Sequence, residues 1–306
     1  MTSFKFNISL LNNLLKLNQF KLPQSSLVFI GIRGGVVADA TNQLFQSEHT
    51  ISILDINFLN PRCTILQWNT SDNTFAAFPA STVPHQRFIK SAIANNGVGV
   101  NCLMTGLFTD YRKGFHKVGS PTGHEAFRQN APHPIRRTAD DIDFEIDDRI
   151  EIDNPFDNIH CGWFDSLTSD SYSSLGCQVI MGFPKCKKPG REKNIGPWKN
   201  FRENAYNIPQ NSFPYILLTG QEISKVASAS NLNIAKLRFG SSGSMVEQLQ
   251  TKLKQKHFYE GNIDGDFGER TLKAVIAFQK YVFGDSSIDG VVGPITSEEL
   301  ELDLSL

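Results

Sequence analysis

The N-terminal two-thirds of the chain carries short apolar runs separated by glycine, proline and polar residues. Such bounded runs are typical of buried β-strands, whereas amphipathic helices repeat their apolar residues every three or four positions. Five segments have the strand pattern: 27–35, 50–56, 63–69, 99–105 and 215–218. Helical spacing is sparse before residue 230. The sequence therefore predicts a mainly β domain over residues 1–222.

The pattern changes to helical spacing in the C-terminal part. A capping box of Ser244 and Glu247 predicts the start of a helix with an apolar face at Val246, Leu249 and Leu253. A second helix is predicted after Gly268, with a stripe made by Leu272, Ala274, Val275, Phe278 and Tyr281. Asp-Gly pairs at 264–265 and 289–290 predict turns in a near-repeat of turn and helix. We expect a small all-α domain over residues 235–306, joined to the first by a linker at 223–234.

Residues 235–301 resemble the three-helix peptidoglycan-binding domains of bacterial cell-wall hydrolases. The resemblance rests on residues at that family's spacing: Leu249-Gln250, Asp264-Gly265, Phe267-Gly268, Thr271, Ala274-Val275, Phe278-Gln279, Asp289-Gly290 and Gly293-Pro294. Most of these positions have a structural role, because helices this short need every apolar contact and turn residue. The resemblance implies wall binding through a shallow groove, without identifying the contact residues.

One pair of residues in the β-rich part can carry covalent chemistry. His160 and Cys177 stand 17 positions apart (177 − 160), each beside a short apolar run. A thiol reacts as its thiolate, and an imidazole can take the proton near neutral pH and return it to a leaving amine. Gly176 removes a side chain next to the sulfur, so that a substrate carbonyl can approach. The backbone N–H groups of Gly176 and Cys177 are candidates for an oxyanion hole.

The cysteines also have a purely structural interpretation. A cysteine in an apolar strand is more often a small buried hydrophobe than a reactive thiol. This interpretation is given to the other four cysteines, Cys63, Cys102, Cys161 and Cys186. A zinc site is a further alternative, but no Cys-x-x-Cys or His-x-x-x-His pair supplies ligands at metal spacing. We expect no metal and no cofactor.

The order of the pair, histidine before cysteine, separates this chain from papain-like and NlpC/P60-like peptidases. His160 followed by Ser174-Leu175-Gly176-Cys177 resembles the YkuD-type L,D-transpeptidase signature, in which a histidine is followed by Ser/Thr-His-Gly-Cys. Leu175 departs from that signature at the second histidine, and Gln178 departs where the family usually has Arg or Asn. The resemblance implies a β-sandwich catalytic domain.

Carried over residue by residue, the resemblance makes Cys177 the acyl-accepting nucleophile and His160 its base. Ser174 would shape the turn before the nucleophile. In the family the backbone carbonyl just after the histidine commonly orients the ring, and here that residue is Cys161. The resemblance thus implies a role for the carbonyl of Cys161 rather than for its sulfur.

The loops contribute weaker candidates. Residues 184–198, rich in lysine, proline and glycine, predict a loop able to cover the active-site mouth. Four histidines in loop-like stretches are expected to be exposed polar residues: His85, His116, His124 and His133. Of these, His116 and His124 are reserve candidates for substrate contact.

Composition excludes several classes of partner. The chain has 30 Lys+Arg against 31 Asp+Glu, so no basic excess indicates nucleic acid. Its five cysteines, an odd number, argue against a disulfide framework. No apolar stretch has the length of a membrane span, and residues 1–22 lack the pattern of a secretory signal. The acidic run 140–148 alternates with apolar residues and predicts an exposed strand face rather than a calcium loop.

We therefore predict a peptidoglycan-modifying cysteine enzyme acting on stem peptides by L,D-transpeptidase exchange, L,D-carboxypeptidase cleavage or both. Peptidoglycan stem peptides and glycan are the expected partners, with action at the cell wall in the periplasm. Without an evident export signal, delivery by an injection system or a phage lysis pathway is expected, and an immunity protein or secretion machinery would then be a further partner. The alternatives are a non-enzymatic wall-binding protein, favoured by Leu175 and Gln178, and another cysteine amidohydrolase of the wall.

Overall fold

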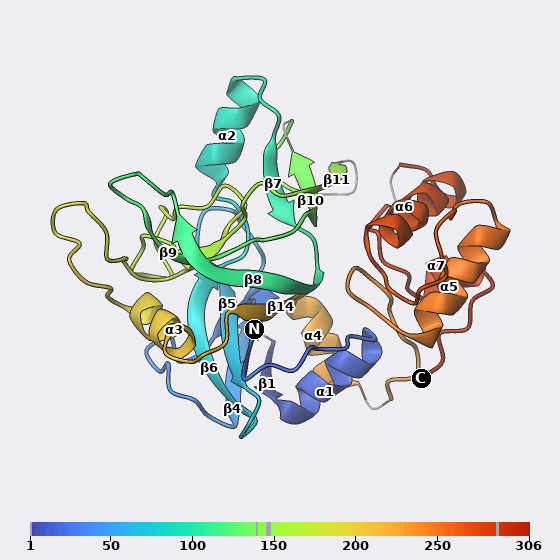
Figure 1. Ribbon diagram of the computed structural model, residues 1–306, viewed down its shortest axis with the longest axis horizontal. Coiled ribbons are helices and arrows are strands. Elements are labelled where there is room, and N and C mark those ends of the chain that lie inside the picture. The colour runs from blue at the N-terminus through green and yellow to red at the C-terminus, as the bar shows by residue number, and fades with distance from the viewer. Residues whose placement is uncertain (1, 139, 145–147, 230, 286–287) are drawn as a thin grey trace.

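An eight-stranded barrel forms the centre of the N-terminal part of the protein (Figure 1). The structure is a computed structural model that describes residues 2–138, 140–144, 148–229, 231–285 and 288–306. The barrel strands are β2 (Leu27–Arg33), β5 (Cys63–Asn69), β6 (Thr74–Ser81), β8 (Gly106–His116), β9 (His124–Arg128), β12 (Ile159–Cys161), β13 (Gln178–Ile180) and β14 (Ser212–Thr219). Around the barrel they follow the order β12-β13-β6-β5-β2-β14-β8-β9. The pairs β12/β13 and β14/β2 are parallel, and the others are antiparallel.

The expected mainly β architecture is confirmed, but the sheet differs from the sandwich that the family resemblance implies. Instead of two stacked sheets, the strands close through the pairing of Ile159 on β12 with Phe127 on β9. Closure removes the exposed edges that an open sheet would present. The hydrophobic pattern indicates some of the strands, such as β2 and β5, but not β6, β8 or β9, and it does not indicate which strands pair. It therefore does not separate the two architectures.

Both faces of the barrel wall are buried, which explains the continuous apolar runs. On β2, Phe29 packs inside the barrel, while Val28, Ile30 and Ile32 face an outer layer of helices. That layer contains α1 (Ile8–Leu17) and α4 (Gly220–Ser228), whose apolar side chains join the same outer core. A strand buried on both faces loses the polar alternation of a half-exposed strand.

Two small sheets flank the barrel. One has the order β1-β4-β3, formed by β1 (Ser3–Asn7), β4 (Glu48–Ile53) and β3 (Gly35–Val37). The other has the order β11-β10-β7, formed by β11 (Arg149–Asp153), β10 (His133–Thr138) and β7 (Val100–Leu103). The second sheet borders the candidate site, because Asn101 on β7 points toward it.

Among the described residues before 230, four helices interrupt the part of the chain in which helical spacing is sparse: α1, α4, α2 (Gln86–Ala94) and α3 (Pro197–Tyr206). The α4 helix occupies the first half of the segment predicted as a linker. Thr219 caps it by accepting the N–H of Glu222, and Ile223 and Val226 bury one face. With only 9 residues, α4 repeats its apolar spacing too few times to be recognised as a helix.

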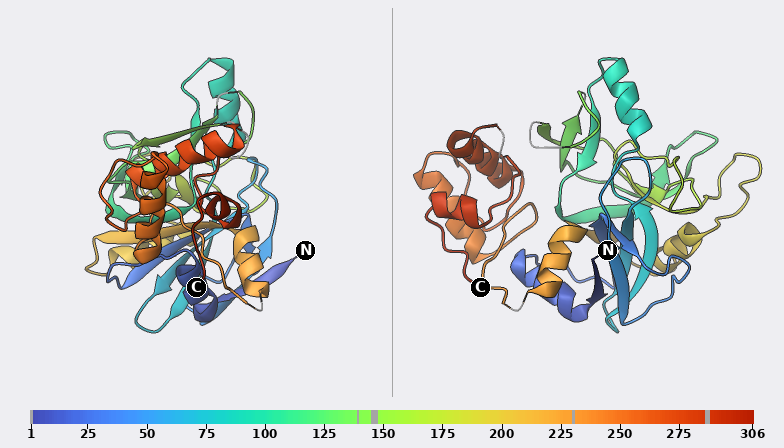
Figure 2. Two further views of the ribbon diagram at one scale, coloured as in Figure 1. Left: turned by 90° about the vertical axis from the view of Figure 1, so that its right-hand side faces the viewer. Right: turned by 180° about the vertical axis from the view of Figure 1, so that it is seen from behind.

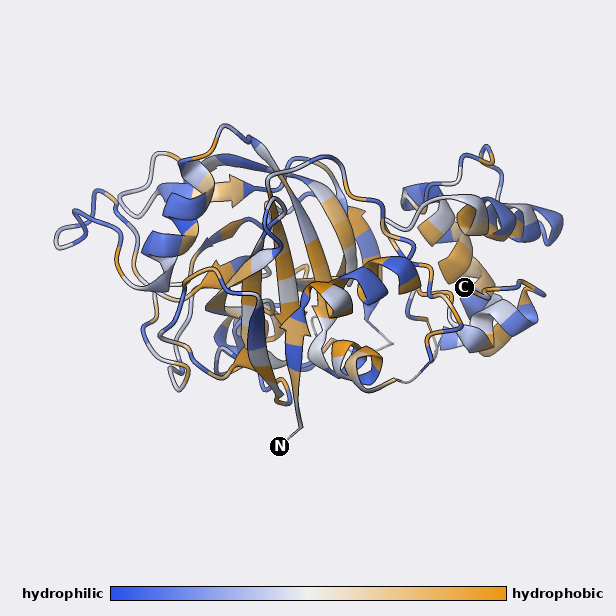
Figure 3. Ribbon diagram, turned by 90° about the horizontal axis from the view of Figure 1, so that it is seen from below, coloured by the Kyte–Doolittle hydropathy of each residue, from blue (hydrophilic) through white to orange (hydrophobic). Residues whose placement is uncertain are grey.

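The C-terminal unit is the small helical body that its sequence predicted (Figure 1). It contains α5 (Ser244–Gln255), α6 (Glu269–Phe283) and α7 (Pro294–Glu299). The predicted capping box does not form, because the N-cap of α5 is Gly243, at φ 111°, and Ser244 is already helical. Figure 3 shows that apolar residues recur along these helices and along the barrel strands.

Two buried glutamines explain the near-repeat in this unit. Gln250 on α5 donates to Asp264 Oδ1 at 2.6 Å and accepts the N–H of Gly265 at 3.0 Å. Gln279 on α6 makes the equivalent bonds to Asp289 Oδ1, at 2.8 Å, and to the N–H of Gly290, at 2.9 Å. Each Asp-Gly turn is thus fixed to a helix by one side-chain amide.

The segment before α5 joins the two parts of the protein closely (Figure 2). Leu107 N–H donates to the carbonyl of Phe239 at 3.0 Å, and the Phe239 ring stacks on Phe108 with centroids 5.6 Å apart. Ser241 Oγ donates to the carbonyl of Asn18 at 2.6 Å. The same segment pairs with the C-terminal unit through Leu237 and Val292. Only a short stretch between α4 and this docked segment can act as a linker.

The acidic run forms bends at 140–143 and at 148, so the strand predicted there is wrong for those residues, and 145–147 lie outside the described residues. The neighbouring strand β11 begins at Arg149. Within the described ranges, no helix combines the length and apolar character needed to cross a bilayer.

Candidate active site

The parallel pairing of β12 with β13 brings His160 and Cys177 to the same surface. His160 is in register with Val179, and Cys177 stands two residues before Val179, just ahead of β13. Because strand residues two apart share a face, His160 and Cys177 are diagonal neighbours on one side of the sheet. Cys161 has the opposite orientation and packs in the barrel interior with an exposed fraction of 0%.

The His160 ring is held at its Nδ1 edge. Nδ1 lies 2.7 Å from the carbonyl oxygen of Cys161. A carbonyl only accepts, so Nδ1 carries the hydrogen and Nε2 keeps its lone pair. The Nε2 atom is buried without a hydrogen-bond partner among the described residues. It is therefore free to accept a proton from the neighbouring thiol.

Two further histidines surround this ring, both from the β8–β9 hairpin, where His116 and His124 pair directly. His124 Nδ1 lies 2.8 Å from the carbonyl of Thr122, so its Nε2 is an acceptor, 3.3 Å from His160 Nδ1. His116 stacks on His160 with centroids 3.9 Å apart, and its Nδ1 accepts from Asn158 Nδ2 at 3.1 Å. The hairpin thus places both reserve candidates against the predicted base rather than in exposed loops.

The other two loop histidines are buried as well, contrary to the prediction. His85 caps α2 by accepting the N–H of Arg87, and its Nε2 bonds the carbonyl of Asp170 at 2.7 Å. His133 Nε2 lies 2.7 Å from Asp110 Oδ1. Both nitrogens of the His85 ring are thus hydrogen-bonded within the fold, which gives this residue a structural role. His133 Nδ1, by contrast, is buried without a hydrogen-bond partner among the described residues.

Burial keeps this histidine cluster neutral near pH 7. Desolvation lowers the pKa of His160 well below its ordinary value, and the neighbouring His116 and His124 lower it further. Desolvation also lowers the pKa of His124, and it lowers the pKa of His116 to about 3. Neutral imidazoles are the form in which a ring can accept a proton.

Burial also raises the pKa of the Cys177 thiol, and the nearby Asp157 carboxyl raises it further. The backbone N–H groups of Asn158 and of Cys177 itself oppose this rise by donating toward the sulfur. The thiol is therefore protonated at neutral pH in the free protein, 3.6 Å from the carbonyl of Phe156. A reaction at this sulfur needs proton transfer to the base as the sulfur attacks.

The turn before Cys177 is closed by Ser174. Its Oγ donates to the carbonyl of Cys177 at 2.7 Å and accepts the N–H of Gly176 at 3.2 Å. One of the two backbone donors expected for an oxyanion hole, the Gly176 N–H, is therefore already engaged. The Cys177 N–H is the remaining backbone candidate.

Gly176 makes room for a polar pair rather than for substrate. At φ +146°, a Cβ on this residue would lie 2.0 Å from Asn101 Nδ2 and 2.6 Å from Asp157 Oδ1. Asn101 donates to Asp157, and both residues line the pocket of Cys177. Burial raises the pKa of Asp157 to about 7, although the bond from Asn101 lowers it in part. No local pattern indicates this pair, because its members are 56 positions apart in the chain.

The two departures from the family signature have different surroundings. Leu175 is 53% exposed at the pocket that contains Cys177. Gln178 is fully buried, donates to the carbonyl of Gly176 at 2.9 Å and accepts from Tyr215 at 3.1 Å. Gln178 is thus tied to the turn, whereas Leu175 faces whatever occupies the pocket.

The pocket around Cys177 has a volume of about 460 Å³, within the range of small-ligand sites. The β8–β9 connection contributes Lys117 to its lining, and β9 contributes Arg128, which also covers the Phe156 ring at 5.1 Å. The loop at 184–198, predicted to cover the mouth, contributes no residue to this lining. Its Arg191 and Lys188 lie against Phe183 and Trp163 instead.

One group of described residues has the composition of a metal site. A ring nitrogen from each of His116 and His160 and the sulfur of Cys177 lie within 4.8 Å of one another. A metal must lie near the plane of each imidazole, at about 2.0 to 2.1 Å for zinc. Rings stacked with 12° between their planes have no shared in-plane point at that distance. The arrangement does not fit a metal unless His116 leaves its stack.

Comparison with known proteins assigns the class of the C-terminal unit. Residues 242–300 match the model of the peptidoglycan-binding domain family PG_binding_1. The C-terminal unit is therefore a peptidoglycan-binding domain, as its sequence predicted.

Two curated relatives are similar to a part of this chain. A spore cortex-lytic enzyme of Bacillus subtilis is 34% identical over 88 residues, which are 29% of this chain and 28% of the relative. A spore cortex-lytic enzyme of Halalkalibacterium halodurans is 42% identical over 65 residues, 21% of this chain and 19% of the relative. The chain thus spans less than a third of either relative. No solved structure matches it.

Proposed function

We propose that the protein is a peptidoglycan-acting cysteine enzyme in which Cys177 is the nucleophile and His160 the base. The observation that carries the proposal is the state of the His160 ring. Its Nδ1 is bound to the Cys161 carbonyl, and its Nε2 is buried without a partner in a cluster that contains the Cys177 sulfur. His85, which caps α2, has both ring nitrogens hydrogen-bonded. His133 Nδ1 is also buried without a partner among the described residues, but His133 does not belong to the group that contains the Cys177 sulfur.

The proposed reaction begins with a neutral thiol, because burial raises the pKa of Cys177. As the sulfur adds to a stem-peptide carbonyl, Nε2 of His160 takes the thiol proton. The Nδ1–H of the resulting imidazolium stays bonded to the Cys161 carbonyl. The Cys177 N–H is the donor proposed for the tetrahedral oxygen. Nε2 then returns its proton to the departing amine, which leaves a thioester on Cys177.

Resolution of the thioester determines the product. An amine acceptor gives L,D-transpeptidase exchange or cross-linking, and water gives L,D-carboxypeptidase cleavage. In either case His160 accepts a proton from the attacking group, and the thiol is restored as the carbon–sulfur bond breaks. This chemistry rests on the resemblance of His160 and the Ser174-Leu175-Gly176-Cys177 turn to the YkuD-type signature.

Two features of the chain support a wall substrate. Lys117 and Arg128 line the pocket of Cys177 and suit the carboxylates of an acidic stem peptide. The peptidoglycan-binding domain at 242–300 would hold the protein on the polymer and raise the local concentration of stems. Delivery through an injection system or a lysis pathway stays a prediction.

The test is mass spectrometry of tetrapeptide muropeptides incubated with the protein and a labelled D-amino acid, with Cys177→Ala as the control. We expect tripeptide product, labelled tetrapeptide, or both, and neither with Cys177→Ala.

A second candidate function is hydrolysis of another wall bond by the same cysteine, an amidohydrolase reaction. The names of the two relatives favour lytic action, although they cover a small part of this chain. Cleavage elsewhere in the muropeptide, with the terminal D-alanine retained, would select this candidate. Binding to sacculi without any product would instead select the non-enzymatic alternative.

A further inference from the structure

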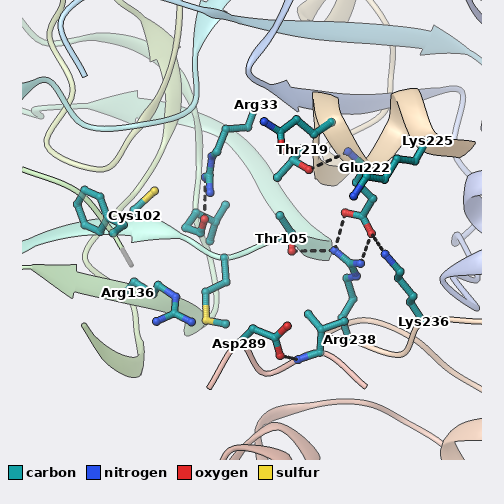
Figure 4. A pocket seen from close by; sticks show the side chains of 15 residues that line it. Arg33, Cys102, Thr105, Arg136, Thr219, Glu222, Lys225, Lys236, Arg238 and Asp289 are labelled. Carbon is teal, nitrogen blue, oxygen red and sulfur yellow. Dashed lines mark hydrogen bonds and ion pairs between the residues drawn. The ribbon is translucent and has the colours of Figure 1, made fainter. Parts of the chain in front are cut away.

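A cavity of about 380 Å³ lies between the barrel and the peptidoglycan-binding domain. Figure 4 shows that its walls come from separate parts of the chain, with Arg33 and Cys102 on the barrel side and Lys225 on α4. Arg238, from the docked segment before α5, and Asp289, from the turn before α7, complete the enclosure. None of its lining residues belongs to the pocket of Cys177.

Positive charge dominates this interdomain cavity. Five cations line it, Arg33, Arg136, Lys225, Lys236 and Arg238, against two carboxylates, Glu222 and Asp289, an excess of three (5 − 2). The whole chain, by contrast, has a formal net charge of −1. Within the part of the chain that the structure describes, no carboxylate lies at ion-pair distance from Arg33 or Lys225. The cavity therefore holds cationic groups whose charge the protein does not neutralise.

Several polar contacts hold the Arg238 side chain in place between the barrel and the peptidoglycan-binding domain. The Arg238 side chain is 4% exposed, donates to Thr105 Oγ1 at 2.8 Å and pairs with both oxygens of Glu222. Its Nε is buried without a partner among the described residues. Lys236 also reaches Glu222, at 3.5 Å. Glu222 is thus fully used by this pairing. Arg33 donates to Thr82 Oγ1 and to the carbonyls of Thr82 and Leu103 rather than to a carboxylate, so its charge and that of Lys225 remain for an anionic ligand.

One strand separates this cavity from the candidate active site. Side chains alternate along β7, so Asn101 lines the pocket of Cys177 and Cys102 lines the interdomain cavity. Arg136 on β10 is the strand partner of Cys102 on β7, and it lines the same cavity. A polymer with repeated acidic stems can therefore place one stem at Cys177 while another reaches the interdomain cavity.

We infer that the interdomain cavity is a second binding site, for a ligand that carries two carboxylates, and that its occupant is an acidic stem peptide of peptidoglycan. The identity of the occupant rests on the proposed function. Guanidinium and ammonium groups that lack an internal carboxylate are suited to pair with the carboxylates of a ligand, and arginine can do so with two parallel bonds. Binding there would involve the barrel, α4 and the binding domain together, so the wall polymer would stabilise their junction.

The test uses calorimetric titration of full-length Cys177→Ala protein with a soluble disaccharide-tripeptide. Adding Lys225→Gln should weaken binding about threefold, and Lys225→Glu about tenfold, because Lys225 is exposed and loses a charge-assisted contact. Lys16→Gln is the matched control, since Lys16 is likewise an exposed lysine in the last turn of a helix and lies outside the cavity. This control should bind as the parent does.

Titration with two other ligands tests whether the interdomain cavity binds carboxylates. The same muropeptide with its carboxylates amidated should lose the part of binding that depends on Lys225. Titration with inorganic phosphate tests whether the cavity binds a phosphate instead of a carboxylate. Unchanged affinity of the Lys225→Glu protein, undiminished binding of the amidated muropeptide, or Lys225-dependent binding of phosphate alone would overturn the proposal. If binding depends on Lys225 but the protein with Cys177 intact modifies no muropeptide, this site stands and the proposed catalysis fails.

Discussion

The imidazole rings of His116 and His160 stack with their centroids 3.9 Å apart and 12° between their planes. His116 covers one face of the His160 ring, while the Cys161 carbonyl and His124 Nε2 contact its Nδ1 edge. The hairpin and β12 therefore fix the ring from two directions, so that its free Nε2 keeps one orientation.

Replacement of His116 separates stacking from proton transfer. His116→Phe keeps a flat ring over His160 and should retain kcat/KM on muropeptides within about threefold, whereas His116→Ala should lose roughly tenfold or more through misplacement of the base. The pH profile of kcat/KM should keep its shape in both variants. Equal losses for Phe and Ala, or a changed profile, would show that a His116 nitrogen takes part in the reaction.

Asp157 makes stability depend on pH. Its pKa is raised to about 7 in the folded protein, against about 3.9 for an unperturbed Asp. The folded state therefore binds more protons than the unfolded state between these values, so stability falls as pH rises from about 4 to about 7 and then levels off. Urea unfolding over this range should show a loss of a few kcal/mol that Asp157→Asn largely removes. Parallel pH curves for the two proteins would contradict this account.

Asp157 also raises the pKa of the Cys177 thiol. Asp157→Asn should therefore speed alkylation of Cys177 by iodoacetamide near neutral pH, because more of the thiol is ionised. A rate equal to that of the parent protein would mean that burial alone sets the thiol pKa.

Gly176 should be among the glycines least tolerant of substitution. Gly176→Ala places a Cβ against Asn101 and Asp157 at φ +146°, and we expect a loss of about 3 kcal/mol in unfolding free energy. Gly119→Ala is the control, because Gly119 is at φ +84° but has no atom within 4 Å of the added Cβ. Its cost should be only about 1 kcal/mol. Similar losses in the two variants would mean that the polar pair yields to the methyl group.

Removal of the peptidoglycan-binding domain should separate targeting from chemistry. Phe239 docks on β8 of the barrel and Ser241 on Asn18 at the end of α1, so a chain ending at residue 243 keeps these contacts, whereas one ending at 234 does not. The protein 1–243 should lose far more activity on intact sacculi than on soluble muropeptides, because the domain supplies local concentration. Equal losses on both substrates would show that the domain completes the site or the fold.

Much of the fold follows from local patterns. The run at 27–35 predicts β2, and the one at 63–69 coincides with β5, because strands buried on both faces are continuously apolar. The C-terminal domain was predictable from its repeated Asp-Gly turns. By contrast, α4 is too short for its spacing to stand out, and the closure of the barrel depends on a contact between Phe127 and Ile159 that no local pattern contains.

The candidate site, like the fold, could be predicted from the sequence only in part. The sequence indicates His160 and Cys177 because their residue types, order and spacing suit the proposed chemistry. The Asn101–Asp157 pair and the positions of His116 and His124 come from strand register, which a single sequence does not specify. At Leu175 the sequence lacks the second histidine of the family signature. The β8–β9 hairpin nevertheless brings the imidazoles of His116 and His124 to the site.

The central claim is that Cys177 forms a thioester with a stem peptide, and intact-protein mass spectrometry tests it most directly. The protein is mixed with excess tetrapeptide muropeptide and quenched in acid within seconds, and the modified residue is located by peptide mapping. Cys161→Ala serves as the matched control thiol, since its sulfur is buried in the barrel. We predict an adduct equal in mass to the muropeptide minus D-alanine, on Cys177, in both the parent and the Cys161→Ala protein. An adduct on another residue, or turnover of muropeptide by the Cys177→Ala protein, would contradict the account.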